Sequence, residues 1–309
     1  MKKMKILILC SKNSGRVAPF IVDQVKALQK LGVQCEYFTI EKKGIRGYLQ
    51  SFVPLNRKIQ EYKPDLIHAH FGISGVLANL QRIVPVITTY HGCDINKFNL
   101  RIIALFPLLF SKFNIFVSQN QADKVKVFRK KYAIIPCGIN SDDFYPLSKI
   151  ELRKKLNWDL TKKIILFSSD FSRLEKNAIL AFQAIEMLPG YELKELKGYN
   201  REELRTLMNA CDAGLLTSIR EGSPMFVKEM MACGRPLVCT DVGDVRNQIE
   251  NVKGCEIVDF TPSSVKKALE RVIQVQEVKY PTNRLKANDN DVIAEKIRQI
   301  YILIIKSIK

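Results

Sequence analysis

The 309-residue sequence has no long uncharged apolar run. A membrane-spanning helix needs about 20 consecutive apolar residues, and the longest candidate here runs only from Ile102 to Phe110. The apolar run near the start of the chain covers Ile6 to Cys10, which is too short for the core of a signal peptide. We therefore expect a cytoplasmic protein that does not span the bilayer.

Paired cysteine motifs and low-complexity tracts are also missing. The eight cysteines form no CxxC pair and lack the density of a small secreted scaffold, so we expect free buried thiols in a reducing compartment. Hydrophobic residues make up 47% of the chain and charged residues 26%, which is ordinary for a packed globular protein. The length suggests two domains.

Acidic residues are scarce, since 31 Asp and Glu stand against 49 Lys and Arg, for a net charge of +18. Residues 1–146 hold 22 basic and 9 acidic side chains, whereas residues 147–309 hold 27 and 22. A field of this strength suits nucleic acid, an anionic membrane face or a phosphorylated substrate, and equally a basic surface that is merely soluble. The basic residues are scattered and no aromatic–basic recognition motif appears, which argues against nucleic acid.

Short apolar runs alternate with amphipathic segments along the chain. Lys5–Cys10 and Lys163–Ser168 each look like the first strand of an α/β domain, because both are continuous apolar runs typical of parallel strands covered on both faces. An amphipathic helix is expected from about Ala18 to Leu31, closed by Gly32. Further strands are expected at Gln34–Thr39, Leu66–Ala69, Val86–Tyr90, Ile115–Ser118, Ala133–Ile135, Ala213–Leu216, Pro236–Cys239 and Glu256–Val258.

This alternation predicts two doubly wound parallel sheets that face a cleft. The segment from Asn140 to Ser148 looks like a hinge, so we expect one Rossmann-like domain over residues 1–146 and a second over residues 147–290. The last helix, residues 291–309, has an apolar face that must be buried against another element, and we expect it to pack back on the first domain.

The stretch REGSPMFVKEMMACGRPLVCTD sets two glutamates, Glu221 and Glu229, eight residues apart around a Gly-Ser-Pro turn. Ser223 is expected to cap the following helix, with Pro224 in its first turn, and the free amides there would form an anion site near Ser223 to Val227. The carboxylates suit the vicinal hydroxyls of a sugar and a ribose, so the pattern fits a nucleotide sugar. Solvated helix-face carboxylates would give the same pattern if they balanced Arg220, Lys228 and Arg235.

All three histidines of the chain, His68, His70 and His91, follow predicted strands in the first half. Their clustering at strand ends suggests cleft chemistry more than core filling. Gly15 with Arg16, after the first strand, stands where a backbone can approach a ligand closely. Neither first strand precedes a GxGxxG motif, so a dinucleotide cofactor is poorly supported. No DxD motif lies between apolar strands and no convincing cluster of His and Cys ligands appears, so we expect no metal.

Four motifs together resemble the retaining, nucleotide-sugar-dependent glycosyltransferases of family 4, which have the GT-B fold of two Rossmann-like domains. They are HAHFG, HGCD, IPCGINSDDF and REGSPMFVKEMMACGRPLVCTDVGD, and they run in order through nearly the whole chain. The specific part is the E-x7-E motif from Glu221 to Glu229, followed by MACGRPLV and TDVG.

The resemblance implies roles for single residues. Glu221 would contact the transferred sugar, Glu229 the ribose, and His91 would lie beside the donor sugar near the reaction centre. Arg173 and Lys176 would neutralise the leaving diphosphate, although their spacing is tighter than usual and Ser172 replaces a customary glycine. The other donor-binding residues would be Gly15, Gly92, Gly222, Ser223, Pro224, Met225, Phe226 and Val227, and the acceptor side would include His68, His70 and Arg16.

An enzyme of this kind would transfer the sugar with retention, through an ion pair, and would stabilise the diphosphate with cations and helix amides rather than a metal. We expect no cofactor, a UDP- or GDP-sugar donor, and a saccharide or lipid-linked acceptor used in polysaccharide, lipopolysaccharide or glycolipid synthesis. The basic first domain would sit peripherally on the inner face of the plasma membrane. Ile102 to Phe110 would touch the membrane there, or would form a buried helix with a solvated face.

A second interpretation is a protein without activity of its own. Between Ala178 and Arg205 the chain has room for little more than one helix and the strand-like Tyr191–Leu196, so the second domain is shortened. A degenerate glycosyltransferase of this kind would serve as a saccharide- or nucleotide-binding partner subunit. The presence of Glu221, Glu229 and His91 together favours the enzyme, because a protein that only binds a saccharide or nucleotide would not require all three residues.

Overall fold

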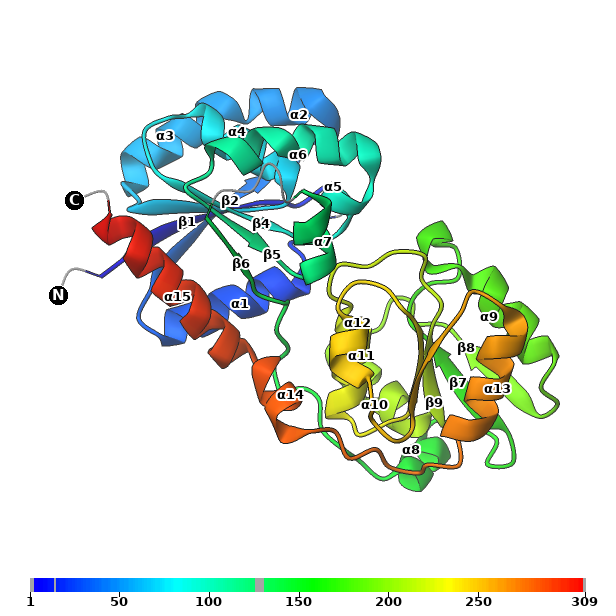
Figure 1. Cartoon of the computed structure of the whole chain (residues 1–309). Coiled ribbons are helices and arrows are strands. Elements are labelled where there is room, and N and C mark those ends of the chain that lie inside the picture. Colours follow the sequence, from blue (N-terminus) through cyan, green and yellow to red (C-terminus); the bar gives the residue numbers. More distant parts are fainter. Residues whose placement is uncertain (1–2, 14, 126–130, 308–309) are drawn as a thin grey trace. The chain divides into compact units, whose positions relative to one another are not determined.

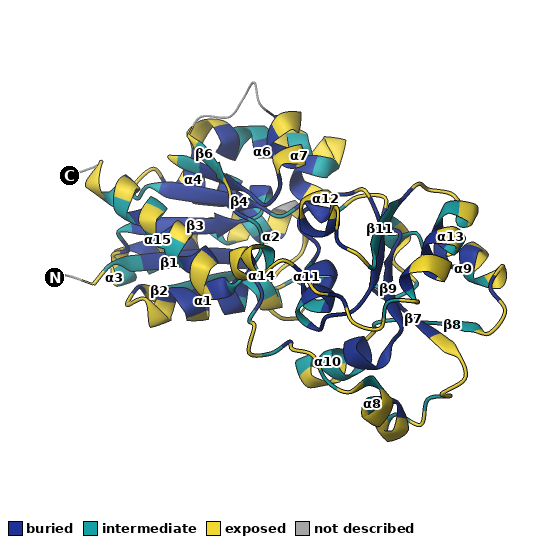
Figure 2. Ribbon diagram, turned by 60° about the horizontal axis from the view of Figure 1, so that its bottom comes forward, coloured by how far each residue is buried: buried dark blue, intermediate teal, exposed yellow. Residues whose placement is uncertain are grey.

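The computed structural model describes residues 3–13, 15–125 and 131–307. The chain divides into two compact units, Met1–Gly138 with Asn290–Lys309, and Ile139–Asp289. Each unit is built around its own parallel sheet with helices on both faces, so the predicted α/β class with two Rossmann-like sheets is confirmed. Figure 2 shows the strands mostly buried and the outer sides of the helices exposed.

The first unit contains a six-stranded sheet in the order β2-β1-β3-β4-β5-β6, with all pairs parallel. Its central strands are buried along nearly their whole length, because helices cover both faces of the sheet. The buried stretch is apolar in β1 but includes His68, His70, Thr88 and Thr89 in β3 and β4. The strands are β1 (Lys5–Ser11), β2 (Gln34–Ile40), β3 (Leu66–His70), β4 (Val86–Tyr90), β5 (Phe113–Phe116) and β6 (Tyr132–Ile134).

Helices cover both faces of this sheet. In Figure 1, α1 and α15 lie side by side on one face, while α2, α3, α4 and α6 lie on the other. The last helix, α15, buries Ile293, Ile297, Tyr301 and Ile304 in the core that β1 and α1 share. The bounds are α1 (Pro19–Lys30), α2 (Gly44–Gln50), α3 (Phe52–Tyr62), α4 (Gly72–Leu80), α5 (Cys93–Asn96), α6 (Phe98–Phe110), α7 (Gln119–Lys124) and α15 (Asn290–Lys306).

The second unit contains a five-stranded parallel sheet in the order β11-β10-β9-β7-β8. The strands are β7 (Lys163–Phe167), β8 (Tyr191–Lys194), β9 (Ala213–Leu216), β10 (Leu237–Thr240) and β11 (Cys255–Val258). The helices are α8 (Lys149–Lys155), the 3-10 turn η1 (Leu174–Lys176), α9 (Ala178–Glu186), α10 (Arg201–Ala210), α11 (Met225–Ala232), α12 (Val245–Ile249), α13 (Pro262–Val272) and α14 (Thr282–Ala287).

The segment from Asn140 to Ser148, predicted as a hinge, is bound to the second unit. Phe144 is buried in that unit's core, Asp143 forms an ion pair with Arg201, and the backbone N–H of Leu147 donates to the side chain of Asn209 at 2.8 Å. The chain therefore passes between the units earlier than the predicted boundary, at Gly138–Ile139, and returns at Asp289–Asn290.

Two other expectations need correction. The strand expected over 115–118 is β5, which begins at Phe113, because the buried Asn114 is satisfied by hydrogen bonds with the hydroxyl of Tyr90 and the carbonyl of Leu108. The eight cysteines are free, as expected, but they are not all buried, and Cys93 is exposed. Within the described residues, no helix is both long and apolar enough to cross a membrane.

Candidate active site

Three histidines meet at the carboxyl edge of the first sheet. His70 ends β3, His91 follows β4, and His68 lies inside β3 rather than beyond it as predicted, so the adjacent parallel strands bring the three rings together. The rings stack in series, with centroids 4.4 Å apart for His68 and His70 and 5.2 Å apart for His70 and His91. Nδ1 of His70 lies 2.9 Å from Nε2 of His91. The structure therefore brings together the cluster that the sequence predicted.

The three rings differ in what they leave for a ligand. Both nitrogens of His68 are engaged, by the Tyr301 hydroxyl at 2.5 Å and the Thr89 hydroxyl at 2.7 Å, so this ring is held inside the core. Nε2 of His70 is buried and has no hydrogen-bond partner. Burial lowers the pKa of His68 and of His91 to about 3, so these rings are neutral hydrogen-bonding groups at pH 7.

The loop that carries His91 is folded around a carboxylate that the sequence analysis did not single out. Asp94 accepts hydrogen bonds from the backbone N–H groups of Gly72, His91 and Gly92, at 3.2, 3.2 and 2.9 Å. Gly92 has φ +137, a conformation that favours glycine. Burial raises the pKa of Asp94 to about 6 against the opposing effect of these amides. The HGCD motif was the available signal for this role.

Other groups flank His91. Its Nδ1 lies 3.5 Å from Sγ of Cys137, and its ring packs against Phe20 of α1 and Phe71 at centroid distances of 4.8 and 4.7 Å. Gly15, in the loop after β1, has φ +87 with open space around it. Arg16 beside it is exposed. Both residues therefore follow a strand of the same sheet and reach its carboxyl edge.

In the second unit, two of the predicted residues touch each other. Nζ of Lys176 lies 2.5 Å from Oε1 of Glu221, and the Ser218 hydroxyl donates to the same oxygen at 2.7 Å. The side chains of Lys176 and Glu221 are only 12% and 15% exposed. The Thr217 hydroxyl holds the turn that carries Lys176 by donating to the carbonyls of Lys176 and Asn177, both at 2.9 Å.

Arg173 is held differently from Lys176. Its Nε and Nη2 donate to Oε1 of Glu175 at 3.0 and 2.6 Å, and its side chain is about half exposed. The two cations that the resemblance grouped together are therefore bound to different carboxylates. Of the two, Lys176 contacts the E-x7-E motif.

Ser223 does not cap α11, contrary to the prediction. The helix begins at Met225 with Pro224 at its N-cap, because the Ser223 hydroxyl is engaged elsewhere: it donates to Asp244 at 2.7 Å and accepts from Lys228 at 2.5 Å. Nζ of Lys228 also lies 3.5 Å from Asp244, and the Lys228 side chain is 0% exposed. The interpretation in which Lys228 is a solvated countercharge is therefore wrong.

The loops around Gly222 pack closely. A Cβ on Gly243, which has φ +63, would lie 2.5 Å from the carbonyl oxygen of Gly222. Phe226 and Val227 bury their side chains in the core, so only their backbone groups are left for a ligand. Glu229 is half-buried on α11, and Met225 is half-buried at its start. Among the residues that the structure describes, no three His, Cys, Asp or Glu side chains are grouped to hold a metal ion.

Comparison with known proteins gives matches for both units. The model described as Glycosyltransferase Family 4 matches residues 17–143, and that described as Glycosyl transferases group 1 matches residues 163–275, so together they span more than half of the chain. The putative teichuronic acid biosynthesis glycosyltransferase TuaC of Bacillus subtilis (strain 168) is 27% identical over 230 residues, which cover 64% of this chain and 58% of TuaC. The match thus spans under two thirds of that relative.

A second relative is the UDP-Gal:alpha-D-GlcNAc-diphosphoundecaprenol alpha-1,3-galactosyltransferase of Escherichia coli, 20% identical over 97% of this chain and 89% of its own. Among solved structures, the sucrose-phosphate synthase of Thermosynechococcus elongatus has a TM-score of 0.87 and 16% identity, covering 99% of this chain and 100% of its own. Anabaena HepE in complex with UDP-glucose has a TM-score of 0.70 and 18% identity, covering 98% and 100%. The chain belongs to the glycosyltransferases that these two models describe, Family 4 in its first part and group 1 in its second, and it has the GT-B fold.

Proposed function

We propose that the protein is a retaining glycosyltransferase that moves a sugar from a UDP- or GDP-sugar to a saccharide or lipid-linked saccharide acceptor. The contact between Glu221 and Lys176 carries this proposal. It sets side by side a carboxylate suited to sugar hydroxyls, from the loop between β9 and α11, and a cation suited to phosphate, from the turn η1 after β7. The names of the relatives agree, since one uses a UDP-sugar with a diphosphoundecaprenol acceptor and one solved structure holds UDP-glucose.

The proposed donor roles follow from the chemistry of these groups. Hydroxyls of the sugar would replace Lys176 on Glu221, which would free the ammonium for the diphosphate. The amides of residues 222–227 and the dipole of α11 would add positive potential there. Glu229 would accept hydrogen bonds from the ribose hydroxyls.

In the proposed reaction, the bond between the anomeric carbon and the diphosphate oxygen breaks first, and the leaving group keeps the electron pair. The acceptor oxygen then forms its bond on the same face of the sugar, and its proton passes to a diphosphate oxygen. Lys176, with Arg173 in support, would stabilise the charge on the leaving group, so we propose a reaction that does not depend on a metal.

For the first unit we propose acceptor binding. Gly15, Arg16 and His70 reach the carboxyl edge of its sheet, whereas His68 is a structural neighbour of His70 because both of its nitrogens are engaged. His91 would serve the transferred sugar through Nδ1, which lies 3.5 Å from the weakly bonding thiol of Cys137. The excess of basic residues in 1–146 suits an acceptor carried on the inner face of the plasma membrane.

The test is release of UDP or GDP from a panel of sugar nucleotides, with detergent-solubilised undecaprenyl-diphosphate sugars as acceptors. We expect release from one donor and its loss in Glu221→Ala and Lys176→Ala. The product's anomeric configuration, read by NMR, should equal that of the donor; inversion would refute the retaining mechanism.

The alternative is a partner subunit that binds a saccharide or nucleotide without activity of its own. The bond between Arg173 and Glu175 favours it, because it occupies one of the two cations proposed for the diphosphate. Nucleotide binding without release of the diphosphate from any donor would establish this alternative.

A further inference from the structure

The outward face of α6 is apolar where a helix of a water-soluble domain is normally polar. In the helix FNLRIIALFPLLF only Asn99 and Arg101 carry polar side chains. Ala104, Pro107 and Leu108 are buried, and α6 packs against α4. The opposite side exposes Phe98, Ile102, Ile103, Leu109 and Phe110, with Phe98 72% and Ile102 55% exposed.

The apolar surface continues beyond α6. Leu80 ends α4 and Ile83 lies in the turn after it, and both are exposed, Ile83 to 64%. We call these seven residues the α6 face: Leu80, Ile83, Phe98, Ile102, Ile103, Leu109 and Phe110. Scattered exposed apolar side chains are ordinary, but a set gathered on one helix and the end of its packing partner indicates an interaction surface.

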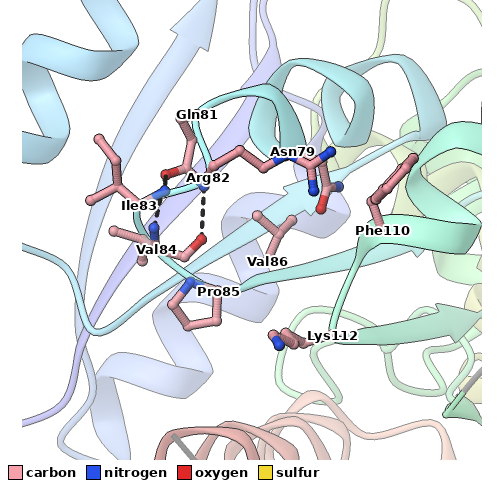
Figure 3. A pocket seen from close by; sticks show the side chains of 9 residues that line it. All are labelled: Asn79, Gln81, Arg82, Ile83, Val84, Pro85, Val86, Phe110 and Lys112. Carbon is pink, nitrogen blue, oxygen red and sulfur yellow. Dashed lines mark hydrogen bonds between the residues drawn. The ribbon is translucent and has the colours of Figure 1, made fainter.

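A pocket of about 330 Å³ adjoins this face at the amino edge of the sheet, where α4 ends and β4 begins. Figure 3 shows its lining, which includes two cations, Arg82 and Lys112, next to Phe110. The guanidinium of Arg82 lies 4.4 Å from the centroid of the Phe110 ring. Lys112 is exposed. Within the described part of the chain, neither cation has a carboxylate within ion-pair distance.

The turn that presents Arg82 is fixed and strained. The side-chain carbonyl of Gln81 accepts from the N–H groups of Ile83 and Val84 at 2.7 and 2.8 Å, and its amide donates to the carbonyl of Val84 at 2.7 Å. Arg82 has φ +56, a left-handed conformation that glycine adopts with less strain. The hydrogen bonds of Gln81 therefore fix the backbone of the turn that carries Arg82.

The part of the sequence that forms this face is rich in basic residues and poor in acidic ones. Between Leu66 and Ala122 the sequence has a single carboxylate, Asp94, and that carboxylate is buried. The same stretch carries four cations: Arg82, Lys97, Arg101 and Lys112. An apolar patch bordered by cations is complementary to a bilayer with anionic headgroups, which offers hydrocarbon beneath a layer of phosphates.

We propose that the α6 face docks on an anionic phospholipid bilayer, and that Arg82 and Lys112 bind a lipid phosphate in the adjoining pocket. The inference deepens the proposed function and rests on it for its purpose, since only the short helix α5 and Lys97 separate α6 from His91 and Gly92. A face along α6 would therefore hold these two residues close to the membrane that carries a lipid-linked acceptor.

Vesicle flotation tests the proposal. The full-length protein is mixed with vesicles of equal parts phosphatidylglycerol and phosphatidylcholine, or of phosphatidylcholine alone, and the bound fraction is measured across lipid concentrations. We expect binding to the mixed vesicles, and at least tenfold weaker binding for Phe98→Ser with Ile102→Ser. Arg82→Gly with Lys112→Gln should weaken binding by about fivefold for each lost charge.

Two controls match these variants. Lys26→Gln with Lys296→Gln removes the same charge from α1 and α15, on the other face of the first sheet. Ile150→Ser with Leu160→Ser removes two exposed apolar side chains from the second unit. Both controls should bind vesicles within about twofold of the wild type, given the weak effect of charges remote from the surface. Inorganic phosphate at millimolar concentration should not displace the protein.

Three results would overturn the proposal: no flotation of the wild type, equal losses in the controls, or a concentration-dependent dimer that Phe98→Ser with Ile102→Ser abolishes while vesicles do not bind. The last result would assign the face to a second copy of the chain. A second measurement distinguishes failure of the docking proposal from failure of the proposed function: the shift in melting temperature that sugar nucleotides cause in the absence of vesicles. Protein that shows the shift but does not float refutes only the docking, and protein that floats without the shift refutes only the donor site.

Discussion

Replacing Lys228 with methionine should destabilise the second unit far more than a typical lysine substitution. The Lys228 side chain is fully buried, and its ammonium contacts the Ser223 hydroxyl and the Asp244 carboxylate. Methionine fills similar space but leaves the carboxylate without its cation. Removing one partner of a buried ion pair costs about 3–5 kcal/mol. We expect the lower end, about 3 kcal/mol, because Asp244 keeps the hydroxyl of Ser223 and the amide of Gln248 as donors.

The assay uses the single tryptophan of the chain, Trp158, which packs against the core cluster that contains Val227 and Met231. Its fluorescence during urea unfolding reports on the unit in which Lys228 lies. The matched control is Lys266→Met, which breaks a partly exposed ion pair with Glu270 on α13. We expect that control to cost less than about 1 kcal/mol.

A double variant separates the ion pair from the packing of the lysine chain. Lys228→Met combined with Asp244→Asn should cost less than the sum of the two single variants, by about 1–3 kcal/mol. A single-variant cost near that of Lys266→Met, or strict additivity in the double variant, would refute the view that the pair is a buried, coupled network. Nucleotide-sugar affinity should fall as well, because Lys228 and Asp244 both hold the hydroxyl of Ser223, which lies in the loop that we propose binds the diphosphate.

Two further predictions concern single residues. Lys176→Ala should lower kcat/KM by on the order of 10²–10³-fold, and Arg173→Ala by less than about tenfold, because the charge of Arg173 is already shared with Glu175; equal losses in initial-rate assays would contradict this ranking. Burial raises the pKa of Asp94 from its ordinary 3.8 to about 6, so the stability that its protonation contributes is complete below pH 3.8 and is lost as the pH rises through 6. From pH 5 to pH 8 the wild type should lose about 1.4 kcal/mol relative to Asp94→Asn in urea unfolding, and a pH-independent difference would show that Asp94 has an ordinary pKa.

The sheets were predictable because the first strand of each unit, β1 and β7, is an apolar run that needs cover on both faces, and strand-like segments then alternate with helical ones. The predicted bounds of Val86–Tyr90 and Ala213–Leu216 agree with β4 and β9. The error at β5 arose because Asn114 interrupts the apolar pattern, and only the folded structure shows that Tyr90 and Leu108 satisfy its amide.

The histidine cluster was predictable from position alone, because adjacent parallel strands end at one edge of the sheet. The sequence could not show that His68 is held inside the core, since its hydrogen-bond partner Tyr301 lies 233 residues away in the sequence. To predict that contact, one would need to know where α15 packs on the first unit.

The burial of Lys228 could not be predicted from the sequence. A lysine beside a glutamate on a helix normally indicates a solvated face. Its burial depends on Asp244, which arrives from the loop after β10. The TDVGD motif was visible, but nothing in its spacing shows that its last carboxylate meets this lysine.

The central claim, a nucleotide-sugar site around the E-x7-E motif, is tested most directly by thermal stability against UDP-, GDP-, ADP- and CDP-sugars with the free diphosphates alongside. A ligand at 100 times its Kd stabilises the folded state by about 2.7 kcal/mol, enough for a shift of a few degrees in Tm. We predict that one nucleotide series raises the Tm of the wild type and of Glu186→Ala, an exposed-carboxylate control in the same unit, and fails to do so in Glu229→Ala. No shift with any ligand, or a shift that persists in Glu229→Ala, would contradict the account.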